Sequence, residues 1–164
     1  MKLTMGVDQS LTSTGIVLLQ DGELKNENFA IRITSNKDNN QYERVRQICD
    51  VFKDLITRSK PDRIVFEGLA FGAKGNSVRV LAGVQFGMIV EALREGYIIN
   101  SNLFIVTPNA VKKFATGVGN SNKEAMFKAL PLDVRETLLK VAKKTTGLFD
   151  LTDAYWIAKY KELK

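Results

Sequence analysis

Four acidic residues are the part of the sequence best suited to chemistry, namely Asp8, Glu67, Asp150 and Asp153. The chain has no histidine, which excludes a Ser-His-Asp triad, a Cys-His pair and zinc held by imidazole. Its single cysteine, Cys49, offers neither a disulfide nor a thiolate metal site. Any reaction must therefore use carboxylates, hydroxyls, lysines or a metal ion bound through oxygen.

Two of the acids end apolar runs that are typical of strands. Residues 2–19 predict a strand that ends at Asp8, a tight polar turn, and a second strand from Gly15 onward. The run from Arg63 predicts a short buried strand that ends at Glu67. An Asp that only hydrogen-bonds its own turn is an equally good interpretation of Asp8 considered alone.

The other two acids, Asp150 and Asp153, open a predicted terminal helix that follows a turn at residues 145–147. Because they are three positions apart, they share one face of that helix. Acids at a helix N-cap and in its first turn are also favoured by the helix dipole. A purely structural role is therefore the alternative interpretation of this pair.

The remaining sequence predicts a single α/β domain over residues 1–164. Asp21-Gly22 predicts a hairpin turn, and Lys25 to Ile33 a third antiparallel strand. The expected sheet is mixed and five-stranded, a three-strand antiparallel meander plus two parallel strands, with helices on both faces. The other predicted elements are a strand at 103–107, helices at 42–59, 77–94, 109–115 and 134–142, and a helix that starts with a capping box at Ser121 and Glu124.

Such a sheet groups the four carboxylates if its first and fourth strands are neighbours. Four ionised carboxylates cannot lie within a few ångströms of one another without compensating charge. Ligands that are all oxygen favour Mg²⁺ or Mn²⁺, and two such ions roughly 4 Å apart can promote in-line attack of water on a phosphodiester. The acids therefore predict metal-dependent phosphodiester hydrolysis.

Positive charge is concentrated in one segment. The net charge is +6, and residues 105–147 hold eight Lys or Arg against three acids. Such a surface attracts a polyanion such as nucleic acid, although solvated lysines on ordinary helices would look similar. No signal peptide is evident and no apolar run reaches the roughly 18 residues of a membrane span, so we expect a cytoplasmic protein.

The predicted helix at Ser77–Arg94 is apolar on more than one face. It also carries Gly83 and Gly87, which would let another backbone approach. These features favour a contact between two copies of the chain, with Val84 in the contact patch. A central core helix without a role between subunits is the alternative.

Together these pieces resemble the RuvC-type Holliday-junction resolvases, which have the ribonuclease H-like fold. The resemblance covers nearly the whole chain, in the family's order and spacing. The short chain and its glycine-rich loop resemble phage members of the family more than bacterial ones. The matching motifs are Gly6-Val7-Asp8 with Ser10, Thr14 and Gly15; Ile64 to Glu67; Pro108, Val111 and Lys112 with Gly117, Gly119 and Lys123; and Asp150, Asp153 and Ala154.

The resemblance implies a homodimeric, Mg²⁺-dependent endonuclease that cuts four-way DNA junctions, or related branched DNA, by paired symmetric nicks with 5′-phosphate and 3′-hydroxyl ends. It implies that the four acids bind two ions per site, that Mn²⁺ substitutes, and that no nucleotide cofactor is needed. A phage-encoded protein would act in the host cytoplasm. The implied DNA contacts are Lys112 and Lys123 at phosphates, Phe71 at the centre of the junction, and also Lys74 and Lys113.

Three other functions remain as alternatives. The Asp8 turn also resembles the phosphate-binding turn of actin-like ATPases and sugar kinases. Those proteins close two such domains around a nucleotide, whereas 164 residues supply one. The second alternative is a ribonuclease that cuts RNA–DNA hybrids, and the third is a non-catalytic DNA-binding module.

Overall fold

The computed structural model describes residues 1–69, 75–142 and 145–162, which form a five-stranded sheet and the helices around it. No helix among these residues is long and apolar enough to cross a membrane. The strands are β1 (Leu3–Asp8), β2 (Thr14–Gln20), β3 (Ala30–Ile33), β4 (Arg63–Glu67) and β5 (Leu103–Val106). The helices are α1 (Gln41–Ser59), α2 (Asn76–Arg94), α3 (Pro108–Thr116), α4 (Lys123–Lys128), α5 (Leu132–Val141) and α6 (Thr145–Glu162), with a short 3-10 helix η1 (Glu27–Phe29).

The sheet has the strand order β3-β2-β1-β4-β5. Strands β1, β2 and β3 pair antiparallel, and β4 is parallel to both β1 and β5. The predicted meander, the two parallel strands and the neighbouring first and fourth strands are therefore confirmed. As a result, Asp8 and Glu67 end adjacent parallel strands.

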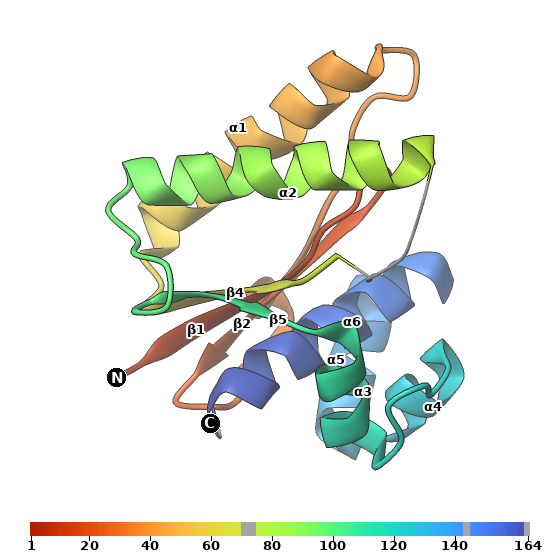
Figure 1. Cartoon of the computed structure of the whole chain (residues 1–164). Coiled ribbons are helices and arrows are strands. Elements are labelled where there is room, and N and C mark those ends of the chain that lie inside the picture. Colours follow the sequence, from red (N-terminus) through yellow and green to blue (C-terminus); the bar gives the residue numbers. More distant parts are fainter. Residues whose placement is uncertain (70–74, 143–144, 163–164) are drawn as a thin grey trace.

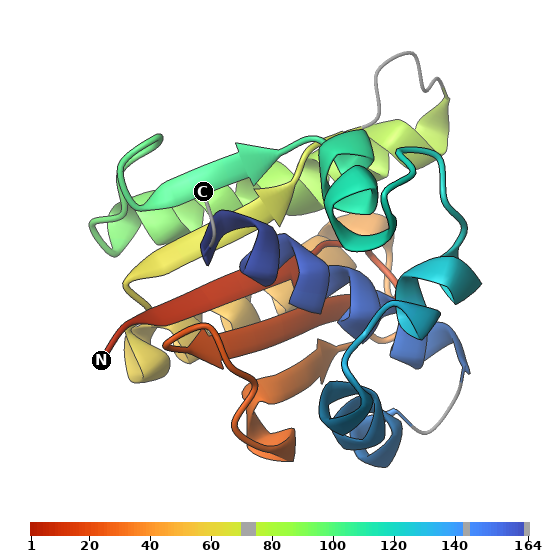
Figure 2. The ribbon, with the colours of Figure 1, turned by 90° about the horizontal axis from the view of Figure 1, so that it is seen from below.

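Helices cover both faces of the sheet, as predicted (Figure 1). Helices α1 and α2 lie on one face, whereas α6 crosses the other face beside α3, α4 and α5 (Figures 1 and 2). Alternate strand residues enter the two cores: Met5 and Phe66 pack under α1 and α2, and Val17 and Val65 pack under α6. A one-residue slip of a strand would turn every side chain to the opposite face of the sheet. Side chains that fit one core would then have to pack in the other, and this disfavours any other register.

Two predicted boundaries are wrong. The strand predicted from Lys25 begins only at Ala30, because the preceding residues form η1. Asn26 caps that short helix by accepting a hydrogen bond from the backbone N–H of Asn28 at 2.9 Å, a local bond that competes with strand pairing. Residues 145–147, predicted as a turn, are the first turn of α6.

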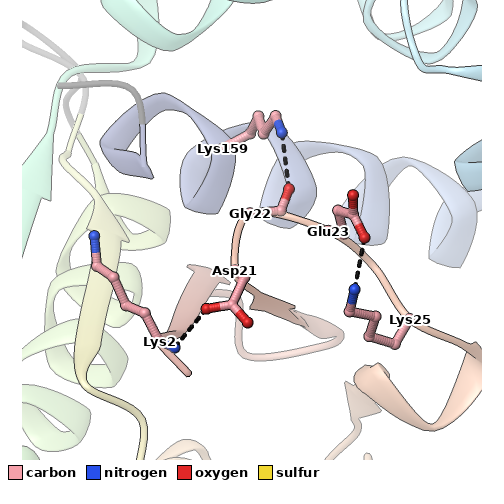
Figure 3. Close-up of polar contacts among 6 residues, drawn as sticks. All are labelled: Lys2, Asp21, Gly22, Glu23, Lys25 and Lys159. Carbon is pink, nitrogen blue, oxygen red and sulfur yellow. Dashed lines mark hydrogen bonds and ion pairs between the residues drawn. The ribbon is translucent and has the colours of Figure 1, made fainter.

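The hairpin turn predicted at Asp21-Gly22 is present and holds α6 against the sheet (Figure 3). Both residues have positive φ, 51° and 80°, as a two-residue type I′ turn requires. The Asp21 carboxylate accepts from the backbone N–H of Lys2 at 2.7 Å, and Lys159 Nζ of α6 donates to the Gly22 carbonyl at 2.8 Å. The last turns of α6 are therefore fixed to the end of the sheet opposite Asp8.

Candidate active site

Asp8 and Glu67 lie side by side at one end of the sheet. β1 and β4 pair in parallel up to the residue before each acid. Side chains alternate along a strand, so Asp8 shares a face with Gly6, which lies against α6, and Glu67 shares a face with Val65, which packs in the α6 core. Both acids therefore face the layer that contains α6.

Helix α6 brings Asp150 and Asp153 to the same place because it packs directly on two glycines of the sheet. A Cβ on Gly15 would collide with the backbone of Asp150. A Cβ on Gly6 would collide with the backbone carbonyl of Ala154. Any larger residue at either position would hold the helix, and its acids, away from the strands.

The position of the two acids within α6 excludes a capping role. The helix begins at Thr145, so Asp150 and Asp153 lie beyond its first turn. Gly147 belongs to this helix rather than to a turn, and a Cβ there would collide with the Arg32 guanidinium. The alternative that these acids only cap a helix is therefore wrong.

Asp8, Glu67, Asp150 and Asp153, the acid cluster, act on one another electrostatically. Burial, reinforced by the carboxylates of Asp153, Glu67 and Asp150, raises the pKa of Asp8 well above its usual value. Burial and Asp153 raise the pKa of Glu67 to about 7. Burial, with a smaller effect of Asp150, raises the pKa of Asp153 to about 6. The cluster thus carries more negative charge than its surroundings neutralise.

The acid cluster suits a divalent cation by its chemistry, although it is not a finished coordination sphere. In the part of the chain that the structure describes, no three Asp, Glu, His or Cys side chains are placed to hold an ion. The donors are nevertheless carboxylate oxygens, which Mg²⁺ and Mn²⁺ prefer. A cation would also offset the burial and the mutual repulsion that raise the pKa values of Asp8, Glu67 and Asp153.

Two of the predicted DNA-binding lysines lie near the acid cluster. Lys123, the first residue of α4, partly offsets the raised pKa values of Asp8, Glu67 and Asp153. Lys112 on α3 does the same for Glu67 and Asp153. An anion bound at the cluster would therefore also meet positive charge from two helices.

Of the other three predicted DNA contacts, the structure describes Lys113 alone. Lys113 is exposed on α3 and does not contribute to the pKa shifts of the acids. Phe71 and Lys74 lie outside the described residues. Among the three of these five residues that the structure describes, Lys112 and Lys123 lie near the cluster and Lys113 does not act on its acids.

The start of α4 differs in detail from the prediction. Asn122, not Ser121, is the N-cap, and its side chain accepts from the backbone N–H three residues on at 2.8 Å. Ser121 instead accepts a hydrogen bond from Thr116 Oγ1 at 3.0 Å. The predicted capping box is wrong, and the helix begins at Lys123, one residue later than a cap at Ser121 would start it.

Two residues that the sequence did not single out, Ser13 and Arg32, hold Asp150. Ser13 Oγ donates to Asp150 Oδ2 at 2.5 Å and accepts from Arg32 Nε at 3.2 Å and from Nη2 at 2.8 Å. Ser13 and Asp150 are 137 positions apart, so only the folded structure shows the pair. The signal that could have found them is Arg32 itself, a charge inside an otherwise apolar strand.

The metal-free protein is expected to lose stability as the pH rises from 5 to 8. Glu67 and Asp153 ordinarily titrate near 4.5 and 3.8, whereas in the folded protein their pKa values are about 7 and about 6. Between those limits the folded state binds more protons than the unfolded chain, so the free energy of unfolding falls with rising pH and levels off above the folded values. We expect a fall of about 2–4 kcal/mol, seen in thermal unfolding as roughly 5–15 °C in Tm.

The control for this pH profile is Glu67→Gln, which removes one of the titrating groups. The variant should show a flatter dependence of Tm on pH. Added Mg²⁺ should raise the Tm of the unmodified protein more at pH 8 than at pH 5, because the cation competes with protons for the carboxylates. An unaltered slope in Glu67→Gln would contradict the assignment of the pH dependence to the acid cluster.

A mixed sheet in this order, with acids at the ends of its first and fourth strands and on its last helix, defines the ribonuclease H-like fold. The chain matches the family described as "Crossover junction endodeoxyribonuclease RuvC" over residues 4–159. The chain therefore belongs to the RuvC family, as its resemblance predicted.

Individual relatives agree with the family match. A Bdellovibrio bacteriovorus crossover junction endodeoxyribonuclease RuvC is 26% identical over 160 residues, which cover 95% of this chain and 87% of the relative. Its counterpart in Salinibacter ruber is 29% identical over 161 residues, 95% of this chain and 82% of the relative. The fold is similar to that of Thermus thermophilus RuvC in complex with a Holliday junction substrate, with a TM-score of 0.71, 18% identity, and coverage of 98% of this chain and 92% of that one. These relatives are bacterial, and a phage origin stays a prediction.

Proposed function

We propose that this protein is a divalent-metal-dependent endonuclease that resolves four-way (Holliday) junctions or related branched DNA. The observation that carries the proposal is the acid cluster, to which two neighbouring strands and α6 contribute and near which Lys112 and Lys123 lie. Membership of the RuvC family supports it. Similarity in fold to a relative whose structure contains a Holliday junction is further support.

The acid cluster would hold two Mg²⁺ ions, with Mn²⁺ as a substitute. When bound, the ions supply positive charge at the scissile phosphate and lower the pKa of water. Lys112 and Lys123 bind phosphate groups by charge, and Ser13, held by Arg32, keeps Asp150 in place. Since the chain has no histidine, carboxylates are the side chains suited to accept the proton of the attacking water. The expected products carry 5′-phosphate and 3′-hydroxyl ends.

One gel experiment tests this function against its alternatives. End-labelled four-way junction, linear duplex and RNA–DNA hybrid are each incubated with and without Mg²⁺. We expect that only the junction is cleaved, that cleavage depends on Mg²⁺, and that the nicks lie at symmetric positions. Preferential cleavage of the hybrid would identify a ribonuclease instead, and tight junction binding with no cleavage in Mg²⁺ or Mn²⁺ would identify a binding module.

Lys123→Ala is expected to weaken junction binding and to reduce its dependence on salt. A lysine that meets a phosphate releases about one counterion, so the slope of log affinity against log salt concentration should fall by about 1. The measurement is fluorescence anisotropy with labelled junction over a salt series, in Ca²⁺ to limit cleavage.

The matched control is Lys25→Ala, which removes the same charge from the surface near the Asp21-Gly22 turn, where Lys25 pairs with Glu23 at 2.6 Å (Figure 3). Its salt slope should equal that of the unmodified protein. Equal slopes for Lys123→Ala and the unmodified protein would show that Lys123 does not contact phosphate.

We further propose that the protein acts as a homodimer joined through α2. An apolar patch on this helix consists of Phe86, Val90 and Leu93, at positions i, i+4 and i+7, which are 61%, 43% and 44% exposed. A two-fold axis at this patch would present one self-complementary surface and two acid clusters. Two clusters are what paired cleavage of two strands requires.

The residues first predicted for this contact need correction. Val84 is fully buried in the core under α2, so a charge there would damage the fold rather than the contact. A Cβ at Gly87 would lie 2.6 Å from Cys49 Sγ, which shows that Gly87 serves packing of α2 on α1. Gly83 has open space beside it. The proposed contact therefore rests on the apolar patch and not on Val84.

Phe86→Glu is expected to give folded monomers that no longer make paired nicks. Two glutamates facing each other across the two-fold axis would repel and stay hydrated. Analytical ultracentrifugation at micromolar concentration measures the assembly, and a supercoiled cruciform plasmid separates nicked products from doubly cut ones. Val51→Glu, at a 46% exposed position on α1, is the control and should stay dimeric. An unmodified protein that sediments as a monomer even with junction DNA would overturn the dimer.

We also infer that residues 1–164 act as a single domain in the cytoplasm. Support comes from the family match over 4–159 and from the sharing of one sheet by both hydrophobic cores. Limited proteolysis with and without junction DNA would test the single domain, because a second unit would be released as a stable fragment.

A further inference from the structure

Two buried side-chain amides converge on the backbone carbonyl of Glu67. Gln9 Nε2 donates to this oxygen at 2.7 Å and Gln85 Nε2 donates at 2.6 Å. Gln9 directly follows β1, whereas Gln85 comes from the middle of α2. The two side chains are 5% and 3% exposed. Glu67, a member of the acid cluster, is thus held through its main chain by two separate elements.

The place of this contact explains why side chains are needed there. The pairing of β1 with β4 ends one residue before Glu67, because the chain leaves the sheet at Gln9 to enter the turn. On the β1 side of β4, strand pairing therefore no longer fixes the position of Glu67. The Gln9 amide takes the position of a further strand donor, and Gln85 adds a bond from α2.

Stability alone does not account for Gln9. Its Oε1 atom is buried and has no hydrogen-bond partner among the described residues. An unsatisfied buried acceptor destabilises a fold, and an apolar side chain of the same length would avoid that cost. The favourable contribution of the Gln9 amide is therefore its Nε2 donor, which binds the Glu67 carbonyl.

We propose that Gln9 and Gln85 are positioning residues that orient Glu67 for sharing a divalent cation with the rest of the acid cluster. This inference rests on the proposed function, because it assumes that the acid cluster binds the metal ions of that reaction. The contact itself is with the main chain of β4 and not with the Glu67 carboxylate. Residues that orient metal ligands commonly change metal affinity by about 10–100-fold when they are replaced. The two amides should act in the same way through the Glu67 main chain.

The test uses Gln9→Met and Gln85→Met, which keep side-chain length and remove the donor. Three quantities are measured: Tm without metal, the affinity for Mn²⁺ without DNA by electron paramagnetic resonance, and the Mg²⁺ concentration that gives half-maximal junction cleavage. We expect Gln9→Met to be at least as stable as the unmodified protein. Both variants should bind Mn²⁺ about tenfold more weakly and need about tenfold more Mg²⁺. Cleavage at saturating Mg²⁺ should recover most of its rate.

The matched control is Gln47→Met on α1, which loses a hydrogen bond from the backbone N–H of Asn36 at 3.0 Å. It should change neither metal affinity nor the Mg²⁺ requirement. Unchanged Mn²⁺ affinity in Gln9→Met would overturn the inference, even if Gln85→Met fails to fold. If the unmodified protein binds Mn²⁺ but cuts no junction, the proposed reaction is wrong and Mn²⁺ affinity alone decides the role of the amides. An unmodified protein that binds no Mn²⁺ would overturn both.

Discussion

Asp8→Asn is expected to lower the rate of junction cleavage by at least about 1000-fold while junction binding stays intact. Asn keeps the size of the side chain but removes the charge of the acid that the other three members of the cluster influence most. The same change should stabilise the metal-free protein near neutral pH, because burial and three neighbouring carboxylates disfavour the ionised form of Asp8. Loss of activity and gain of stability together distinguish a ligand residue from a structural one.

Single-turnover cleavage in Mg²⁺, junction binding in Ca²⁺ and thermal unfolding without metal measure the three effects of Asp8→Asn. Asp54→Asn, an exposed acid on α1, is the control and should leave all three unaltered. Cleavage by Asp8→Asn at the unmodified rate would show that the acid cluster is not the catalytic centre. A lower Tm would show instead that the Asp8 carboxylate stabilises the fold.

Gly15→Ala is expected to destabilise the protein and to reduce cleavage together. The added Cβ would collide with the backbone of Asp150, so α6 must move away from β2 and take its two acids with it. Overpacking of this kind costs about 1–3 kcal/mol, or roughly 2–10 °C in Tm for a domain of this size. Because metal sites tolerate little displacement, we expect cleavage to fall by at least about 100-fold at a temperature where the variant is still folded.

The comparison for Gly15→Ala is Gly83→Ala on α2, where a Cβ meets no atom within 4 Å. Alanine stabilises the interior of a helix more than glycine does, so this variant should be slightly more stable than the unmodified protein, by about 0.5–1 kcal/mol. Differential scanning fluorimetry without metal measures both, with circular dichroism to confirm that each variant is folded. Equal Tm values for Gly15→Ala and the unmodified protein would mean that α6 does not depend on this close contact.

The acids could be predicted from the sequence because strand ends leave a local signal. Asp8 and Glu67 each follow an apolar run, and parallel strands bring such ends to one edge of the sheet. The spacing of Asp150 and Asp153 predicted a shared helix face for the same local reason. The fold class followed from the order of these elements.

The supporting contacts could not be predicted because they join residues distant in sequence. Gly147 looked like a turn residue, yet it lies in α6 where a larger side chain would meet Arg32. Ser13 reaches Asp150 across 137 positions, and Gln85 reaches Glu67 from a helix whose apolar sequence suggested only packing. The prediction that Val84 lies in a contact patch was wrong because the sequence of a helix that is apolar all round does not show which side meets the core.

Assembly of the acid cluster from β1, β4 and α6 has a consequence for protein synthesis. Translation delivers Asp8 early, but Asp150 and Asp153 emerge only after all five strands have left the ribosome. Domains fold as units, and a nascent chain that lacks α6 has two of the four acids and an uncovered sheet face. If the acid cluster is the catalytic centre, as we propose, such an incomplete chain cannot cut the DNA of the cell that makes it. Nuclease activity would thus begin only when the last helix docks.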